Sequence, residues 1–178
     1  TLGVAMLLAL MFSASGYAQE PAASVVQDAA SEGILPEVLR VDDLYQTMAP
    51  EAVYGRTAIE LLRELGTKHY SPVSFDDRFS GEVSDYYIEA LDGQKLYFLE
   101  SDLTALSALR AELDDTLTAG DLQPGFDIYN LYHKRVLERL VWTVEFVENE
   151  LETLSFDTDE ELQIDRKDAP WAQSVEEL

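Results

Sequence analysis

Apolar residues recur at three- and four-residue spacing through most of the chain after residue 41, which is the period of a helix that buries one face. Boundary residues divide this pattern into separate stretches. The first begins near Ala49-Pro50, where proline suits the first helical position, and ends at Gly66. The second takes Ser74 as its N-cap and stops before Gly93. Both stretches are predicted to be amphipathic helices.

Two further stretches complete the pattern, one from Ser101 to Gly120 and the longest from about Pro124 to about Leu151. The wide apolar stripe of the longest stretch is typical of a central helix that several others cover. Strand signals are limited to residues 95–99 and 154–156. We therefore predict a mainly α, multi-helix domain over residues 41–178, with little or no β structure. The predicted core contains Phe79, Tyr86, Leu106, Leu113, Leu131, Leu140 and Val144.

The first 18 residues form an apolar run followed by small residues, with Gly16 and Ala18 at the −3 and −1 positions of a signal-peptidase site. The run is too short to span a bilayer core of about 30 Å as a helix. A buried core helix is the alternative, but no polar face is present. We predict cleavage between Ala18 and Gln19, a signal peptide with a truncated n-region, and a flexible linker over residues 19–40.

The composition argues against several classes of function. With 35 acidic and 12 basic residues, the net charge of −23 disfavours contact with nucleic acid, which requires a basic surface. The chain has no cysteine, which excludes disulfides, thiolate metal sites and a cysteine nucleophile. At 178 residues it is long enough for one domain with a hydrophobic core.

No catalytic, metal or cofactor site is predicted from the residues. His69 lies just past a helix end and His133 lies inside the longest helix, and neither has an obvious serine partner. The acidic run 157–168 has spacings reminiscent of a calcium loop. However, Leu162 stands where that loop needs glycine, and Asp168 stands where it needs a bidentate glutamate. A solvated charged segment is the favoured interpretation.

Charged groups elsewhere are interpreted as structural. Asp76-Asp77 and Asp114-Asp115 are neighbours in sequence, so on a helix their carboxylates point about 100° apart and cannot share a proton. Lys134, Arg135 and Arg139 form a short basic island within the longest predicted helix. We expect this island to pair with acidic side chains of adjacent helices.

Several short motifs, taken in order and spacing, resemble one family of proteins. They are His69-Tyr70, Phe79-Ser80, Asp85-Tyr86-Tyr87, Leu91-Asp92, residues 95–99, Ser101-Asp102, Leu113-Asp114-Asp115, Gly120-Asp121-Leu122, residues 126–130, Arg135, Glu138-Arg139 and residues 165–171. The chain from about Tyr45 to Leu178 is similar to the N-terminal helical region of the tail-specific proteases. These are also called carboxy-terminal processing proteases, and they are periplasmic enzymes of Gram-negative bacteria. The run Asp-Arg-Lys-Asp-Ala-Pro-Trp171 is the most specific part of this resemblance.

The resemblance implies the N-terminal piece of a larger serine endopeptidase that degrades or processes proteins from apolar C-termini. In that family a PDZ domain recognises the apolar tail, and a serine–lysine dyad cleaves. Both are expected beyond Leu178, so this chain alone is expected to be inactive. The helical region is expected to shape the vessel around the protease and to dock a lipoprotein adaptor. The alternative is a free-standing, exported, acidic helical binding module without protease activity.

Overall fold

The computed structural model describes residues 39–178, except 72, 151, 152, 156, 158, 160 and 162. These residues form five α-helices and one 3₁₀ turn, which confirms the mainly α prediction. The only β feature among them is an isolated parallel bridge between Leu99 and Ala172. The elements are α3 (Val41–Leu44), α4 (Ala52–Lys68), α5 (Asp77–Asp92), α6 (Glu100–Thr118), α7 (Gln123–Glu150) and η3 (Val175–Glu177).

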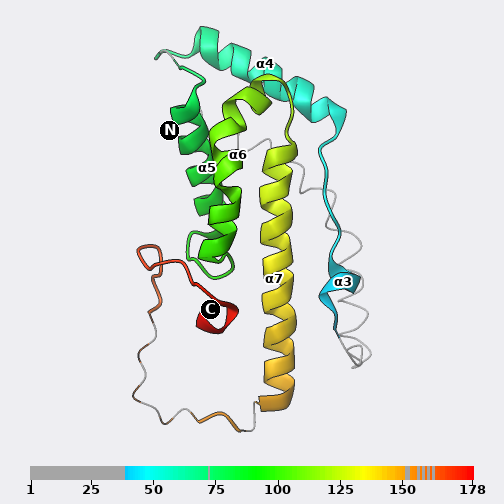
Figure 1. Cartoon of the computed structure of the whole chain (residues 1–178), viewed down its shortest axis with the longest axis vertical. Helices are drawn as coiled ribbons and strands as arrows, with labels where there is room; N and C mark the ends of the chain where they lie inside the picture. The colour runs from blue at the N-terminus through cyan, green and yellow to red at the C-terminus, as the bar shows by residue number, and fades with distance from the viewer. Residues whose placement is uncertain are drawn as a thin grey trace.

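Helices α5, α6 and α7 run side by side, and α4 crosses their upper end (Figure 1). α5 and α6 share the most extensive contact, while α3 lies along the other side of α7. α7 continues well past the lower ends of α5 and α6 (Figure 1). None of the helices in the described part of the chain is both long enough and apolar enough to cross a membrane.

α4 approaches the turn between α6 and α7 closely because both contact points are glycines. A Cβ on Gly55 would overlap the carbonyl oxygen of Gly120. Gly120 itself has a φ of +77°, a left-handed conformation that glycine adopts without steric cost. The predicted end of the third helix at Gly120 therefore serves two purposes, since it turns the chain and admits α4.

Two helix starts differ from the predictions. α5 begins at Asp77, and its N-cap is Asp76 rather than Ser74, because the Asp76 carboxylate accepts a hydrogen bond of 3.1 Å from the amide of Phe79. α4 begins at Ala52 after Glu51 in extended conformation, two residues beyond the predicted Pro50. Aspartate caps a helix as well as serine does, so the sequence left the start of α5 open between Ser74 and Asp76.

The predicted strand over residues 95–99 is wrong except at its last residue. Lys95 has a φ of 55°, in the left-handed region, which breaks an extended run at its start. The next three amides donate to the carboxylate of Asp92 instead of to a neighbouring strand. Only Leu99 makes a β-type contact, the isolated bridge to Ala172.

The core consists of two clusters stacked along the bundle. The upper cluster packs α4 against the others, and the lower one lies between α5, α6 and α7. Their buried members are Ala58, Leu62, Val83, Leu113, Leu117, Leu122 and Phe126 above, and Tyr87, Phe98, Leu106 and Ile128 below. Among the predicted core residues, Leu106 and Leu113 are buried, whereas Phe79 and Leu131 are half-buried against these clusters.

Two predicted core residues face solvent. Tyr86 is 44% exposed while its neighbour Tyr87 is 6% exposed, so the inward face of α5 is one residue out of the predicted phase. Leu140 is 49% exposed and Val144 is half-buried, because this part of α7 lies past the ends of α5 and α6. The prediction of Leu140 as a core residue is therefore wrong.

Candidate functional site

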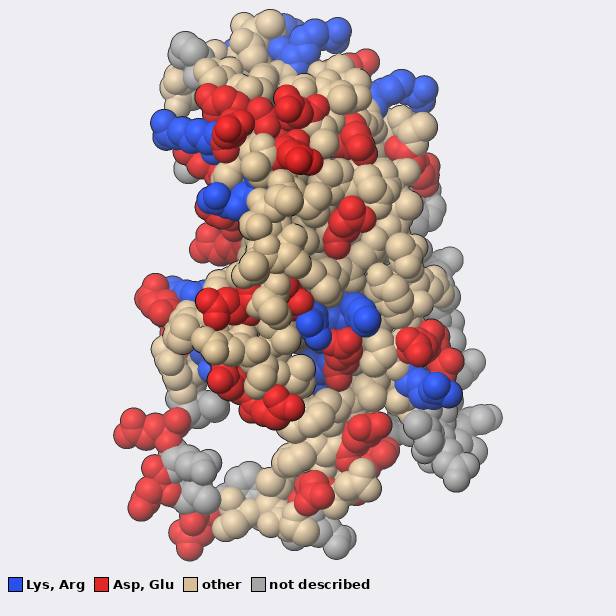
Figure 2. Space-filling view, in the orientation of Figure 1, with Lys and Arg blue, Asp and Glu red and all other residues tan. Residues whose placement is uncertain are grey.

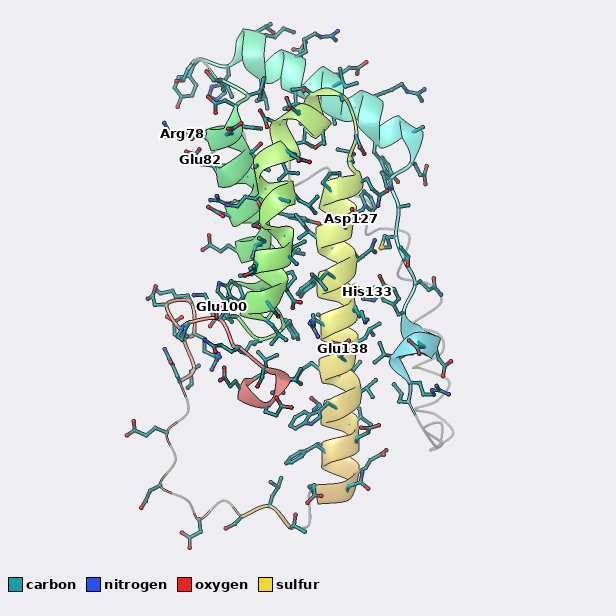
Figure 3. The ribbon with its side chains drawn as sticks, in the orientation of Figure 1. Arg78, Glu82, Glu100, Asp127, His133 and Glu138 are labelled. Atoms are coloured by element: carbon teal, nitrogen blue, oxygen red, sulfur yellow. The ribbon has the colours of Figure 1, made fainter. Side chains whose placement is uncertain are left out.

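Neither histidine has the partners of a catalytic base. His69 ends α4, and its ring nitrogen Nδ1 lies 2.9 Å from the carbonyl oxygen of Ser71. His133 is half-buried between the rings of Tyr45 and Tyr129, with centroid distances of 5.7 and 5.9 Å. Its Nδ1 is buried without a hydrogen-bond partner, and burial lowers the pKa of the imidazole. In Figure 3 His133 points towards α3 rather than into the bundle.

A buried serine, Ser80, lies next to the carboxylate of Asp114, an arrangement that resembles a nucleophile and its base. The Ser80 hydroxyl donates to Asp114 Oδ1 at 2.6 Å and accepts from the Asp114 amide at 2.7 Å. Ser80 is 0% exposed, so a substrate cannot reach its hydroxyl. The pair joins α5 to α6 and satisfies two groups that would be costly to bury alone.

A second buried carboxylate organises the loop between α5 and α6. Asp92 is 3% exposed, and its oxygens accept the amides of Leu96, Tyr97 and Phe98 at 2.7, 2.9 and 2.9 Å. A carboxylate at a helix C-terminus interacts unfavourably with the negative end of the helix dipole. An aspartate at this position therefore indicates that its carboxylate binds specific donors. That signal was available in the sequence, but sequence reasoning missed it.

A third carboxylate connects α6 to α7. Asp102 accepts two hydrogen bonds from Arg135, at 2.9 Å from Nε and 2.8 Å from Nη2, and its Oδ2 also accepts the Leu99 amide at 2.9 Å. Arg135 further donates to Glu138 at 2.8 Å. The hydrogen bonds with Asp102 are the largest cause that raises the pKa of the Arg135 guanidinium. The predicted pairing of the basic island with an adjacent helix is confirmed for Arg135 alone, since Lys134 pairs with Glu138 of α7 itself and Arg139 binds the Leu178 carbonyl.

The segment before α4 is held by an amide side chain of α7. Asn130 accepts from the Met48 amide at 2.9 Å and donates to the Met48 carbonyl at 2.8 Å. A neighbouring β-strand would pair the amide and the carbonyl of Met48 in the same way. Asn130 thereby fixes residues 45–51 against α7 although 82 positions separate the two residues.

The C-terminal segment lies against the loop between α5 and α6. Lys95 donates to the carbonyl of Ala169 and stands over the Trp171 ring at 5.3 Å. Trp171 meets Phe98 edge to face at 6.3 Å, and the Glu100 amide donates to the Ala172 carbonyl at 2.9 Å. The motif that carried the strongest resemblance, residues 165–171, is thus a packing element.

A cavity of about 400 Å³ opens between α5, α6 and this segment, and four of the ionic groups that line it are already engaged. Arg110 is bound by both oxygens of Asp85, at 2.9 and 2.6 Å. Lys95 donates to the Ala169 carbonyl, and Asp92 accepts the loop amides named above. The charged pair Arg78 and Glu82 lies on the outer side of α5, away from α7 (Figure 3). Within the described residues no three His, Asp or Glu side chains are grouped as metal ligands.

These observations define a helical domain whose elements are joined by buried polar contacts. Residues 61–178, about two thirds of the chain, match the family described as tail specific protease N-terminal domain. The chain is 35% identical over 106 residues to the tail-specific protease of Haemophilus influenzae. That alignment covers 59% of this chain and 15% of the length of the relative. The chain belongs to the tail-specific protease family, in the region of its N-terminal domain, which confirms the resemblance.

The predicted signal-cleavage residues, Ala18 and Gln19, lie outside the described residues, as do residues 1–18 and nearly all of the predicted linker. Cleavage there stays a prediction. The predicted domain boundary at residue 41 stays a prediction; α3 starts at this residue and contains no buried residue.

Proposed function

We propose that this chain is the N-terminal scaffold and docking region of a periplasmic, tail-specific serine endopeptidase. The parent enzyme would degrade or process proteins from their apolar C-termini. The observation that supports this most directly is the family match over residues 61–178. The internal use of Ser80, Asp92, Asp102 and Asn130 supports a scaffold role, since each polar group is engaged in holding elements together.

The proposal assigns the chemistry to the rest of the parent enzyme. A PDZ domain would bind the apolar tail, a serine–lysine dyad would cleave, and a lipoprotein adaptor would dock on the helical region. A serine hydroxyl is a weak nucleophile until a base activates it. Among the described residues no serine hydroxyl is hydrogen-bonded to a histidine or a lysine, so we expect this chain alone not to cleave peptides.

Peptide cleavage by three purified proteins tests the proposal: this chain, the full-length parent, and the parent without residues 41–178. The substrate ends in an apolar tail, and the matched control substrate ends in two aspartates. We expect cleavage by the parent alone, with strong preference for the apolar tail. Cleavage by this chain would contradict the scaffold role. A parent that cleaves neither substrate would contradict the protease assignment, and unchanged cleavage after the deletion would leave the region a docking role only.

A further inference from the structure

The second half of α7 exposes apolar side chains that the first half would bury. From Gln123 to Asn130 the helix contains five buried residues, and after Asn130 it contains none. Trp142 is 44% exposed and Val147 is 45% exposed. Apolar residues here lie on two sides of the helix, and a helix that is apolar on several sides is normally covered. Among the described elements, α5 and α6 end before reaching this part of α7 (Figure 1).

One of these two sides is aromatic, and it continues the face that packs on α6 further up the helix. Trp142 and Phe146 are one turn apart and stack with a centroid distance of 5.1 Å and an interplanar angle of 16°. The Arg139 guanidinium stands over the Trp142 ring at 4.6 Å. We name Arg139, Trp142 and Phe146 the aromatic face.

The C-terminal end of the described chain is fixed beside the aromatic face. Arg139 Nη2 donates to the carbonyl oxygen of Leu178 at 2.8 Å, so the residue that contacts Trp142 also binds Leu178. Val175, on the η3 turn just before it, is 45% exposed. Any polypeptide that continues from Leu178 starts within one side chain of Trp142. A segment tethered so closely has a high effective concentration at this face.

Charge restricts what can cover the aromatic face. Residues 140–165 contain nine acidic residues and no lysine or arginine. Acidic side chains are also spread along the whole visible face of the molecule (Figure 2). A second copy would bring two such acidic regions together, and like charges in an interface oppose association. A covering segment with apolar residues flanked by lysine or arginine would complement both the ring surface and the charge.

We infer that the aromatic face is a docking site for the polypeptide that follows Leu178 in the parent enzyme, through a segment with apolar side chains and basic flanks. The inference rests on the proposed function because it needs a longer parent, which the relative's length supports since the alignment covers 15% of it. It places the far half of α7 inside an interdomain interface. α7 would thus couple the scaffold to the domain that comes after it.

Amide hydrogen exchange of residues 139–150 tests the inference in two proteins, this chain and the full-length parent. We expect exchange in the parent to be slower by roughly tenfold or more, because a covered helix opens less often. Trp142→Ala should return the parent to the rate of the short chain, and should leave the unfolding midpoint of the short chain nearly unchanged. The matched control is Tyr86→Ala, since Tyr86 is also 44% exposed but lies on α5. It should not change exchange at residues 139–150.

Three outcomes would overturn the inference: equal exchange in both proteins, protection that survives Trp142→Ala, or self-association of the short chain that Trp142→Ala abolishes. The last would make the face an interface between copies. Repeating the exchange measurement in 1 M salt tests the basic flanks, because screening should weaken their attraction to the acidic side chains and so reduce the protection in the parent. Cleavage is assayed separately, so a parent that protects the helix but does not cleave contradicts the proposed function and not the docking.

Discussion

Both halves of α7 contain apolar residues at helical spacing, but the two halves have different surroundings. Ile128 in the first half is 0% exposed, whereas Leu140 in the second half is 49% exposed. Both belong to one uninterrupted helix of 28 residues. The comparison shows that periodicity identifies a helix and its apolar sides, but it does not state which part of the polypeptide covers them.

Burial of the first half comes from both sides. α5 and α6 cover one side, and the residues before α4 cover the other, where Asn130 binds the backbone of Met48. Arg135 marks the transition, since it makes the last strong contact between α6 and α7 through Asp102.

The largest effect is expected at the transition itself. Asp102→Ala should lower the free energy of unfolding by about 3–5 kcal/mol, since it leaves the half-buried Arg135 without its main partner and the Leu99 amide without its acceptor. Urea unfolding measures this change. Asp115→Ala, an exposed acidic site on the same helix, is the control and should change stability by less than about 0.5 kcal/mol. Similar effects at both sites would show that the Asp102–Arg135 pair contributes little.

Within the first half, Ile128→Ala should cost about 2–4 kcal/mol, because a cavity replaces a fully buried side chain between α5, α6 and α7. The urea midpoint should fall without a change in the slope of the transition. A loss below about 1 kcal/mol would mean that the lower core cluster closes around the gap.

Much of this fold followed from the sequence, and the failures have physical reasons. The four long helices were predicted because their apolar stripes depend on local residues, and glycine marks the ends of α5 and α6. The predicted end of the first helix at Gly66 is wrong, since α4 continues through it to Lys68. Tyr86 was misassigned because α5 turns the small residues Ser80 and Ser84 towards α6, and periodicity ranks a tyrosine above a serine. The role of Asp92 was missed because its three partners depend on a loop conformation that begins with a left-handed Lys95.

For the candidate site, the sequence indicated correctly that Arg135 of the basic island pairs with another helix, but the partner could not be named. Asp102 is 33 residues from Arg135, and one sequence does not show which of many acidic residues lies opposite. The same holds for Asn130 and Met48. Long-range polar contacts depend on how helices pack, so they become visible only in three dimensions.

The half-buried His133 offers a smaller test near the transition. Burial lowers its pKa below the ordinary value, so the unfolded chain binds the proton more readily than the folded chain. Its stabilising contribution is present above the pKa of the unfolded state and is lost as the pH falls through the folded pKa. His133→Phe keeps the ring stack with Tyr45 and Tyr129 and removes the proton site. Between pH 7 and pH 5 the variant should lose less stability than the original chain, by under about 1 kcal/mol. Equal losses in urea titrations would show that the pKa of His133 is the same in the folded and the unfolded chain, as for a well-solvated imidazole.

The smallest effect is expected in the second half of α7. Leu140→Ala in this chain should change the free energy of unfolding by less than about 0.5 kcal/mol, because the leucine is half exposed and alanine is the better helix former. Urea unfolding of this variant beside Ile128→Ala makes the comparison direct, since both remove a branched aliphatic side chain from one helix. If Leu140→Ala cost as much as Ile128→Ala, the far half of α7 would already be packed in this chain, and the contrast between the halves would not hold. A near-zero cost leaves the far half as surface in this chain, which is the condition that a docking role for this end of the helix requires.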